Sequence, residues 1–219
     1  MALLIPLLEE QTPKRTFLRG WLYGFGFYTV GVSWVYISIH TYGGTPQWLA
    51  IILTGLFTAA LGIFFGFFAW SYQKLKLDSL YWIGFPCLWI VFEWMKAWFL
   101  SGFPWLYAGN AFLDTPLSGL APVTGVMGLS LVAVTTSALV VVMFRRPAKQ
   151  KLVAGILVLV WGASYYLQQV NWVAPTMDKS LNIALVQGNI PQEKKWDPKE
   201  RDNIVNTYLL INFIKGQVK

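Results

Sequence analysis

Charged residues are scarce in this sequence. They make up 12% of its 219 residues, whereas ordinary soluble domains carry roughly 25%. Hydrophobic residues make up 56% and aromatic residues 17%, and the mean hydropathy is +0.50. This composition excludes an ordinary soluble domain and predicts an integral membrane protein. In such a protein, a net charge of +7 is typical of membrane topology or contact with anionic lipid, so we expect no nucleic-acid partner.

Cysteine and histidine are scarcer still, with one of each, Cys87 and His40. A single cysteine forms no intramolecular disulfide, and a thiol inside an apolar run is a poor nucleophile. His40 is either a polar cap at a helix end or a general base. The sequence shows no metal-ligand cluster, no Ser/His/Asp set and no phosphate-binding glycine loop after a strand. It therefore predicts no metal site and no cofactor, and the residues alone identify no catalytic site.

Long apolar runs are what the sequence does have. A membrane-spanning helix needs roughly 20 largely apolar residues, and five segments meet this requirement: 17–39, 48–72, 80–100, 123–144 and 152–171. Gly20 and Gly24, like Gly62 and Gly66, are four residues apart. Small residues at this spacing let helices approach closely in lipid. We therefore expect a bundle of about five transmembrane helices.

The loops between these segments alternate in charge. Basic residues precede the first segment and occupy the loops at 73–79 and 145–151, whereas loops 40–47 and 101–122 contain neither Lys nor Arg. Basic loops face the cytoplasm under the positive-inside rule. We therefore expect a cytoplasmic N-terminus at 1–16, a transmembrane domain at 17–172, and an outward-facing region from residue 180 onward.

The last forty residues change character. The stretch LNIALV, from Leu181, is short and partly β-branched, as in a buried strand, and QGN is typical of a turn. Asp197 is a good N-cap and Pro198 suits the first position of a following helix, with Glu200 completing a capping-box-like pattern. One strand and one helix bury too little surface to form a core, because an open strand needs partners.

The loop at 101–122 contains the first candidate site. Gly102 and Pro104 predict a shaped turn, and Phe103, Trp105 and Tyr107 give the turn an aromatic face. A loop of this length is often functional. It either forms an entrance that lays acyl chains against aromatic rings, or it is an ordinary interfacial aromatic belt.

Other candidates lie in or beside the membrane segments. Glu93 and Lys96 are three residues apart, so they share a helical face as a structural or functional ion pair. Gly43 and Gly44 predict a turn that ends a helix or admits a ligand. Trp196 is either a packing anchor or part of a lipid-binding cleft.

Five stretches, taken in order, resemble the successive landmarks of one family. They are GVSWVYISIHTYGG, FEWMKAW, SGFPWLYAGN, GLAPVTGVMGLS and VQGNIPQEKKWD. The family is that of the bacterial apolipoprotein N-acyltransferases, which are inner-membrane enzymes of lipoprotein maturation. The resemblance implies eight membrane helices and a periplasmic nitrilase-like αββα domain that carries a Glu–Lys–Cys triad. It also implies transfer of an acyl chain from phosphatidylethanolamine to the N-terminal diacylglyceryl-cysteine of an apolipoprotein.

The resemblance assigns roles to residues and exposes departures. It implies that Trp196 borders the active site and that Gly102, Phe103, Pro104 and Trp105 lie near the lipid entrance. The triad, the first two helices, most of the nitrilase-like domain and the final helix have no counterpart in this sequence. Cys87 lies in a membrane segment and does not replace the nucleophile. Lys96 stands where the family usually has arginine, and lysine lacks the bidentate fork of arginine.

The expected fold is therefore an α-helical integral membrane bundle followed by the first strand and helix of an incomplete nitrilase-like α/β domain at 180–219. We expect a fragment of such an acyltransferase, from a truncated, split or frameshifted gene, that lies in the bacterial inner membrane and is inactive alone. Two alternatives stay open. One is the membrane half of a split enzyme, completed by a second chain, and the other is a non-catalytic membrane binding or transport subunit.

Overall fold

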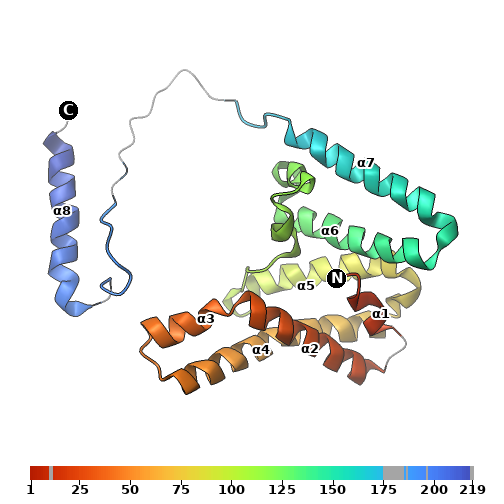
Figure 1. The fold of residues 1–219 in the computed structure, drawn as a ribbon, viewed down its shortest axis with the longest axis horizontal. Coiled ribbons are helices and arrows are strands. Elements are labelled where there is room, and N and C mark those ends of the chain that lie inside the picture. The colour runs from red at the N-terminus through yellow and green to blue at the C-terminus, as the bar shows by residue number, and fades with distance from the viewer. Residues whose placement is uncertain (10–11, 175–184, 186, 196, 218–219) are drawn as a thin grey trace. The chain divides into compact units, whose positions relative to one another are not determined.

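The computed structural model describes residues 1–9, 12–174, 185, 187–195 and 197–217. It divides into two compact units, Met1–Trp172 and Val173–Lys219. Helices make up most of the first unit (Figure 1). In chain order its longer elements are α1 (Leu4–Leu8), α2 (Pro13–Gly31), α3 (Trp34–Ile37), the π-helix η1 (Ser38–Tyr42), α4 (Gln47–Lys74), α5 (Tyr81–Trp98), α6 (Ala121–Arg145) and α7 (Gln150–Gln168).

Several of these helices are long and apolar enough to cross a membrane. Four of them qualify within the described part of the chain: Gln47–Lys74, Leu77–Ser101, Pro116–Arg145 and Pro147–Gln168. A fifth span results if Pro13–Gly31 and Trp34–Tyr42, which are bent by 56° at a short break, cross together. The helical membrane bundle expected from the apolar runs is therefore confirmed, with four or five spans.

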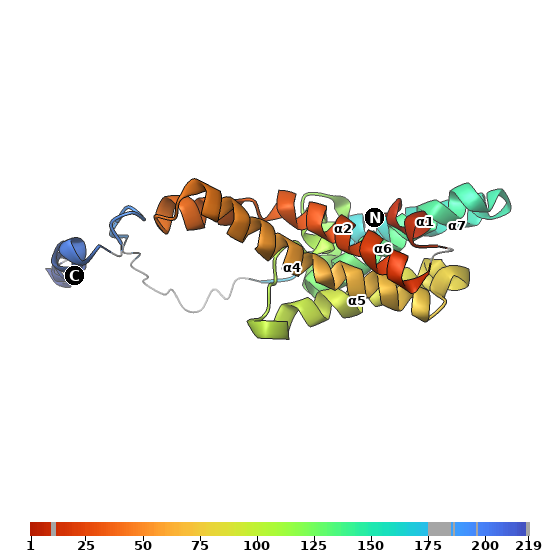
Figure 2. The same cartoon turned by 90° about the horizontal axis from the view of Figure 1, so that it is seen from below.

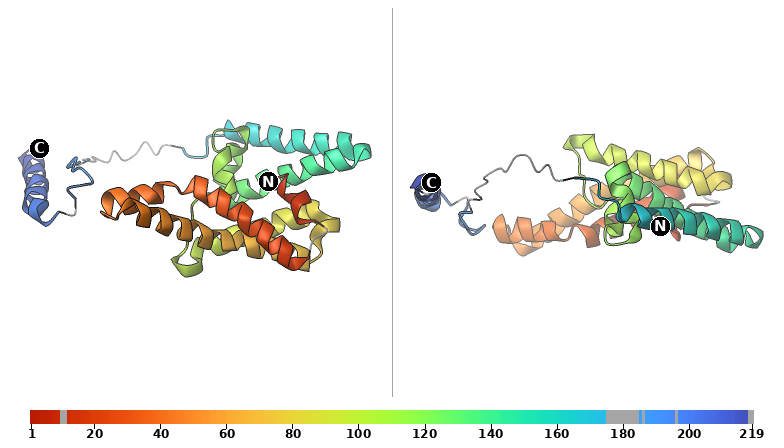
Figure 3. Two further views of the ribbon diagram at one scale, coloured as in Figure 1. Left: turned by 60° about the horizontal axis from the view of Figure 1, so that its bottom comes forward. Right: turned by 90° about the horizontal axis from the view of Figure 1, so that it is seen from above.

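Helices α2 and α4 pack closely along their length, side by side in each view (Figures 2 and 3). A Cβ atom at Gly20 would overlap the Phe65 carbonyl and the Ala69 side chain, and one at Gly62 would lie 2.9 Å from the Phe25 nitrogen. No larger residue fits at either position without a shift of backbone. The glycine spacing in the sequence was thus correctly interpreted as a close helix–helix contact.

The core of the first unit is largely aromatic. Phe68 of α4 makes edge-to-face ring contacts with Phe85 and Trp89 of α5, at centroid distances of 5.2 and 5.6 Å. The short helix α1 packs into the same cluster, where Ile5 and Leu8 are fully buried. Residues that the sequence placed in an N-terminal tail thus contribute to the core.

A long loop, residues 99–120, connects α5 to α6. It contains the short 3-10 helices η3 (Phe99–Ser101), η4 (Ala108–Phe112) and η5 (Pro116–Leu120). Further short 3-10 helices, η2 (Leu77–Leu80) and η6 (Pro147–Lys149), join α4 to α5 and α6 to α7. The segment η5 packs against α7, and η4 packs against α6.

The second unit contains η7 (Pro198–Glu200) and α8 (Arg201–Gln217). Its helix begins where the sequence predicts, because the Asp197 carboxylate accepts a hydrogen bond of 2.9 Å from the Lys199 amide. Glu200 does not complete a capping box. Its carboxylate instead accepts from Asn203 Nδ2 at 3.2 Å and pairs with Lys194 at 3.3 Å. Both partners hold the Glu200 side chain in its charged form, and its pKa is lowered from the ordinary value.

The described residues include no β-strand. The strand expected at 181–187 is not shown, since residues 181–184 and 186 lie outside the described part of the chain. Leu185 and Gln187 have no regular secondary structure, and Leu185 is almost fully exposed. The nitrilase-like start of the second unit therefore stays a prediction.

Candidate functional site

Glu93 and Lys96 lie in the last turns of α5 and are both buried, with exposed fractions of 6% and 5%. Their spacing of three residues places them on the same face of the helix. That face is turned toward the long loop rather than toward the surface of the bundle. Two charged side chains inside a spanning helix are costly, and they persist only where polar partners meet them.

Glu93 finds its partners on its own helix and in the long loop. Its Oε1 atom accepts a hydrogen bond of 2.9 Å from the Trp89 indole and one of 2.7 Å from the Ala108 backbone amide. The other oxygen, Oε2, accepts none from the described residues and is buried. The carboxylate thus holds the loop backbone to α5.

Lys96 binds the same loop at a second point. Its Nζ atom donates a hydrogen bond of 2.9 Å to the carbonyl oxygen of Trp105. The ammonium group also lies 4.9 Å from the ring centroid of Tyr107 and 5.9 Å from that of Tyr28. At these distances the ring faces attract the cation.

The two charges do not contact each other directly. No nitrogen–oxygen distance of 4 Å or less joins Glu93 to Lys96 among the described ion pairs. Each charged group instead forms a hydrogen bond with a main-chain group of the loop. A third contact reinforces them, because the Phe103 amide donates to the Lys96 carbonyl at 2.8 Å.

The loop backbone between these contacts is unusual. Leu100, Ser101 and Leu106 have φ angles of 51°, 76° and 57°, and Gly102 has a φ of 82°. Residues other than glycine rarely adopt this left-handed region, at a cost of roughly 1–3 kcal/mol each. Such a conformation persists only when surrounding contacts over-determine it. The hydrogen bonds to Glu93 and Lys96 are contacts of that kind.

Leu106 anchors the loop to the break between α2 and α3. Its side chain lies against Gly31, so closely that a Cβ atom on Gly31 would overlap it. Beside it, the ring of Trp105 meets that of Trp34 at 6.4 Å, and the ring of Phe103 meets that of Tyr28 at 6.4 Å. The loop therefore touches both α5 and the bent first span.

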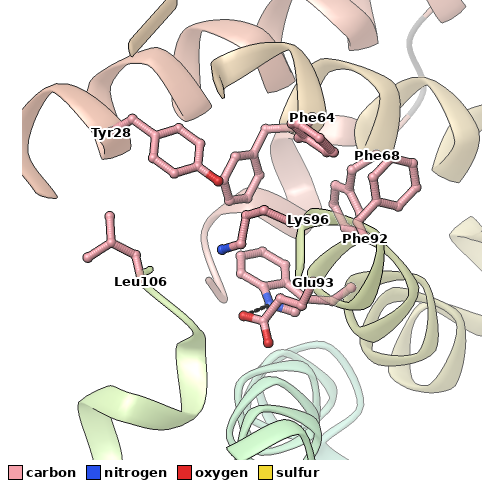
Figure 4. Close-up of a pocket in the computed structure, with 9 residues that line it drawn as sticks. Tyr28, Phe64, Phe68, Phe92, Glu93, Lys96 and Leu106 are labelled. Carbon is pink, nitrogen blue, oxygen red and sulfur yellow. Dashed lines mark hydrogen bonds between the residues drawn. The ribbon is translucent and has the colours of Figure 1, made fainter. Parts of the chain in front are cut away.

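A cavity of about 30 Å³ lies beneath the loop, large enough for about two water molecules. Figure 4 shows the Lys96 ammonium between the Tyr28 ring and the Glu93 carboxylate, with Leu106 across the cavity from Phe68 and Phe92. The lining residues are Tyr28, Phe64, Phe65, Phe68, Trp89, Phe92, Glu93, Lys96 and Leu106. The cavity is thus lined mainly by aromatic rings, together with one acidic residue, Glu93, and one basic residue, Lys96.

An apolar groove of about 480 Å³ runs between α4 and α5. Phe64 and Phe92 line both the groove and the cavity, so the two adjoin. The groove ends at Phe99 and Leu100, where the long loop begins. Ser71 supplies the one polar side chain in its lining, which is otherwise Ala60, Ile63, Phe64, Phe67, Phe92, Met95, Phe99 and Leu100.

The structure brings together some of the predicted site residues and leaves others apart. Phe103 and Trp105 form main-chain hydrogen bonds with Lys96, and Gly102 and Pro104 are their neighbours in the chain. Trp105 is 52% exposed. Gly43 and Gly44 end the π-helix η1 and do not line the cavity. Their part in lipid binding stays a prediction.

His40 contacts the backbone of this same turn. Its Nδ1 lies 2.7 Å from the Thr45 carbonyl oxygen, as expected of a polar group that caps a helix end. Gly44 has a φ of 63°, which suits glycine. Trp196 lies outside the described residues, and its part in a lipid-binding cleft stays a prediction.

Cys87 is exposed on α5. Within the described part of the chain no three His, Cys, Asp or Glu residues come close enough to hold a metal ion.

Sequence reasoning missed several members of the site. Trp89 precedes Glu93 by one helical turn, so its spacing alone could have identified it as a partner. The Ala108 amide and Leu106 carry no such signal, because a loop brings them to α5. Tyr107 was expected on the aromatic face of the loop, but its contact with Lys96 was not. Burial, and secondarily the Glu93 charge, raises the pKa of the Tyr107 hydroxyl from its ordinary value.

This fold and this site define a class: polytopic helical membrane proteins in which two buried charges in a span bind a long aromatic loop. Comparison with known proteins specifies the family. The model for the apolipoprotein N-acyltransferase N-terminal domain matches residues 1–139. The chain belongs to the apolipoprotein N-acyltransferase family.

Curated relatives agree with this assignment. The apolipoprotein N-acyltransferase of Pseudomonas syringae pv. tomato is 41% identical over 220 residues, which cover 96% of this chain and 43% of the relative. That of Azotobacter vinelandii is 42% identical over 210 residues, covering 91% and 40%. That of Photobacterium profundum is 39% identical over 212 residues, covering 92% and 39%. The chain thus spans about two fifths of the length of these relatives.

Proposed function

We propose that this chain forms the membrane part of an enzyme that transfers an acyl chain from a phospholipid to the N-terminal diacylglyceryl-cysteine of an apolipoprotein. Family membership supports the type of reaction. The observation that carries the proposal for this chain is the apolar groove of about 480 Å³ that ends at the aromatic loop. In this proposal, phosphatidylethanolamine is the donor and an apolipoprotein the acceptor.

The groove and loop suit a phospholipid because the groove is lined mainly by apolar side chains and the loop at its end exposes a tryptophan. The groove offers apolar and aromatic surface against which an acyl chain can pack. The loop that begins where the groove ends exposes Trp105. Tryptophan prefers the boundary between lipid and water, where the headgroup of a phospholipid lies. Gly102, Phe103, Pro104 and Trp105 therefore form the proposed lipid entrance.

Photocrosslinking tests lipid binding directly. A phosphatidylethanolamine with a photoreactive acyl chain should label residues of the groove and of the loop, in membranes that contain the full chain. Met95→Trp, which fills the groove, should reduce this labelling severalfold, while Val91→Trp, on the exposed face of α5, should not. Equal labelling of all three proteins would contradict the proposal.

We also propose that the chain lies in the bacterial inner membrane with a cytoplasmic N-terminus and a periplasmic second unit. The alternation of basic and uncharged loops supports this orientation. An alkaline phosphatase fused after Lys179 should be active, and one fused after Lys149 should be inactive. The opposite pattern would reverse the proposed topology.

A polypeptide of these 219 residues is expected to be inactive by itself. Acyl transfer through a cysteine needs a nucleophile activated by a base, and the single cysteine, Cys87, lies in α5 within a candidate span. The nucleophile would then come from residues beyond these 219, in the same polypeptide or in a second one. Incubation of the purified chain with phosphatidylethanolamine and a diacylated lipopeptide should leave the lipopeptide amine free. N-acylation above the rate without protein would disprove this expectation.

A transport subunit is the second candidate, and one observation bears on it. Transporters often place broken helices at a central binding site, and the first span is bent by 56°. At this break Gly31 leaves a notch, and the apolar side chain of Leu106 fills it, so the described residues form no polar site there. Solute uptake into vesicles that depends on Glu93 would favour transport over acyl transfer.

A further inference from the structure

We propose that Glu93 and Lys96 are positioning residues that hold the long loop, and with it Trp105, in place through main-chain hydrogen bonds. The alternative is that the two buried charges serve to neutralise each other. The distinction matters because a neutral pair can be replaced by apolar residues, whereas a pair of loop anchors cannot.

Hydrogen bonding is the first argument for anchoring. Glu93 Oε1 accepts from the Ala108 amide at 2.7 Å, and Lys96 Nζ donates to the Trp105 carbonyl at 2.9 Å. Hydrogen bonds that involve a charged group are shorter and about twice as strong as neutral ones. No ion-pair contact between the two side chains competes with them among the described residues. Each charge thus stabilises the loop more directly than it stabilises the other charge.

The backbone of the loop is the second argument. Leu100, Ser101 and Leu106 adopt left-handed conformations that are unfavourable for residues with a side chain. Leu106, beside the carbonyl that Lys96 binds, sits in the notch at Gly31. A strained segment relaxes when its anchors are removed. We therefore infer that loss of either charge releases the loop while the packed helices below it stay folded.

Hydrogen–deuterium exchange of the full chain in lipid nanodiscs measures this directly. In Lys96→Met, exchange of the amides at 103–109 should rise about tenfold or more, the effect expected when a charge-assisted hydrogen bond is lost. Lys96→Arg, which keeps the charge and the donors, should restore most of the protection. Val91→Ala, on an exposed face of the same helix, should leave exchange unchanged. Amides in the middle of α4 report whether a variant is folded.

The double variant Glu93→Gln/Lys96→Met separates the two explanations, because it contains no net buried charge at this site. If the charges only neutralise each other, the double variant should regain the protection that Lys96→Met loses. If they position the loop, exchange at 103–109 should stay as fast as in Lys96→Met, because the Trp105 carbonyl still has no Lys96 ammonium to bind. Restored protection in the double variant would overturn the proposal, and so would unchanged protection in Lys96→Met.

The consequence for lipid rests on the proposed function. Release of the loop should move Trp105, so that a photoreactive phospholipid labels the loop of Lys96→Met less than that of the unaltered chain. Failure of the proposed function would appear differently, as absence of loop labelling in the unaltered chain. The exchange measurements do not depend on that labelling, so the two failures are distinguishable.

Discussion

Arg145, beside the Tyr81 ring at the start of α5, pairs with Glu9 at 2.6 Å. Glu93 and Lys96, near the end of α5, make no direct ion pair with each other among the described residues. The first pair is partly exposed, with side-chain exposed fractions of 35% and 17%. The second is almost fully buried. Near water, opposite charges can pair directly with each other, because water satisfies the neighbouring main-chain groups. Where the surroundings are apolar, main-chain groups that have no water to bind compete for the same charges.

This comparison shows that a buried charged group in a membrane helix can hold a loop in place by forming hydrogen bonds with its main chain. The long loop leaves the regular helix after Trp98, so its amides and carbonyls lack helical partners. Glu93 and Lys96 supply such partners. The Arg145–Glu9 pair joins helix α6 to the end of α1 and binds no loop backbone in the described contacts.

The largest effect is expected from Glu93→Ala. This change removes the partner of the Trp89 indole and of the Ala108 amide and leaves Lys96 as a buried uncompensated charge. Loss of one member of a buried charged pair typically costs roughly 3–5 kcal/mol. Thermal unfolding of the chain in detergent should shift to markedly lower temperature. A shift no larger than that of Val91→Ala would remove the basis of the comparison.

A smaller loss is expected from Gly20→Val, which tests close packing without any charge. The added methyl groups would overlap the Phe65 carbonyl and the Ala69 side chain, and overpacking typically costs roughly 1–3 kcal/mol. Gly26→Ala is the matched control, because a Cβ atom at Gly26 meets nothing within 4 Å. The same unfolding measurement compares them. Equal stability of the two variants would show that α2 and α4 are less closely packed than the structure indicates.

Asp197→Ala is expected to act locally, in the second unit. It removes the side chain that accepts from the Lys199 amide, and loss of an N-cap typically costs about 1 kcal/mol. Hydrogen exchange at residues 199–203 should rise a few-fold, with no change in α4. Asp197→Asn, which can still cap the helix, should behave like the unaltered chain.

The smallest effect is expected from Arg145→Gln at the end of α6. Partly exposed ion pairs contribute about 0–1 kcal/mol, and the remaining Glu9 can be solvated. The unfolding temperature should therefore change far less than in Glu93→Ala. A loss of stability equal to that of Glu93→Ala would show that burial does not distinguish the two pairs.

Much of this architecture could be predicted from the sequence. The apolar runs predict the spans, because the length of an apolar helix is set by the thickness of the bilayer. The spacings of Gly20 and Gly24 and of Gly62 and Gly66 predict close helix packing, though not which helices pair, and Asp197 predicts the start of the last helix. All of these signals are local or periodic, so they can be read without knowing the fold.

The predictions were less complete where distant segments meet. The spacing of Glu93 and Lys96 placed both on one face but indicated an ion pair, whereas their partners are loop amides and carbonyls. Glu200 resembled a capping box because the residue types fit, but Asn203 and Lys194 bind its carboxylate instead. In both cases a competing partner, not visible in the local pattern, takes the hydrogen bond.

The sequence by itself determined the membrane character, the succession of apolar helices and the family, because hydropathy and ordered motifs are properties of the linear chain. Only the tertiary structure decided what the two buried charges bind. Their partners are main-chain groups at Trp105 and Ala108, and every residue has such groups. The choice depends on the left-handed path of the loop and on the notch at Gly31, which bring those groups, rather than others, to the end of α5.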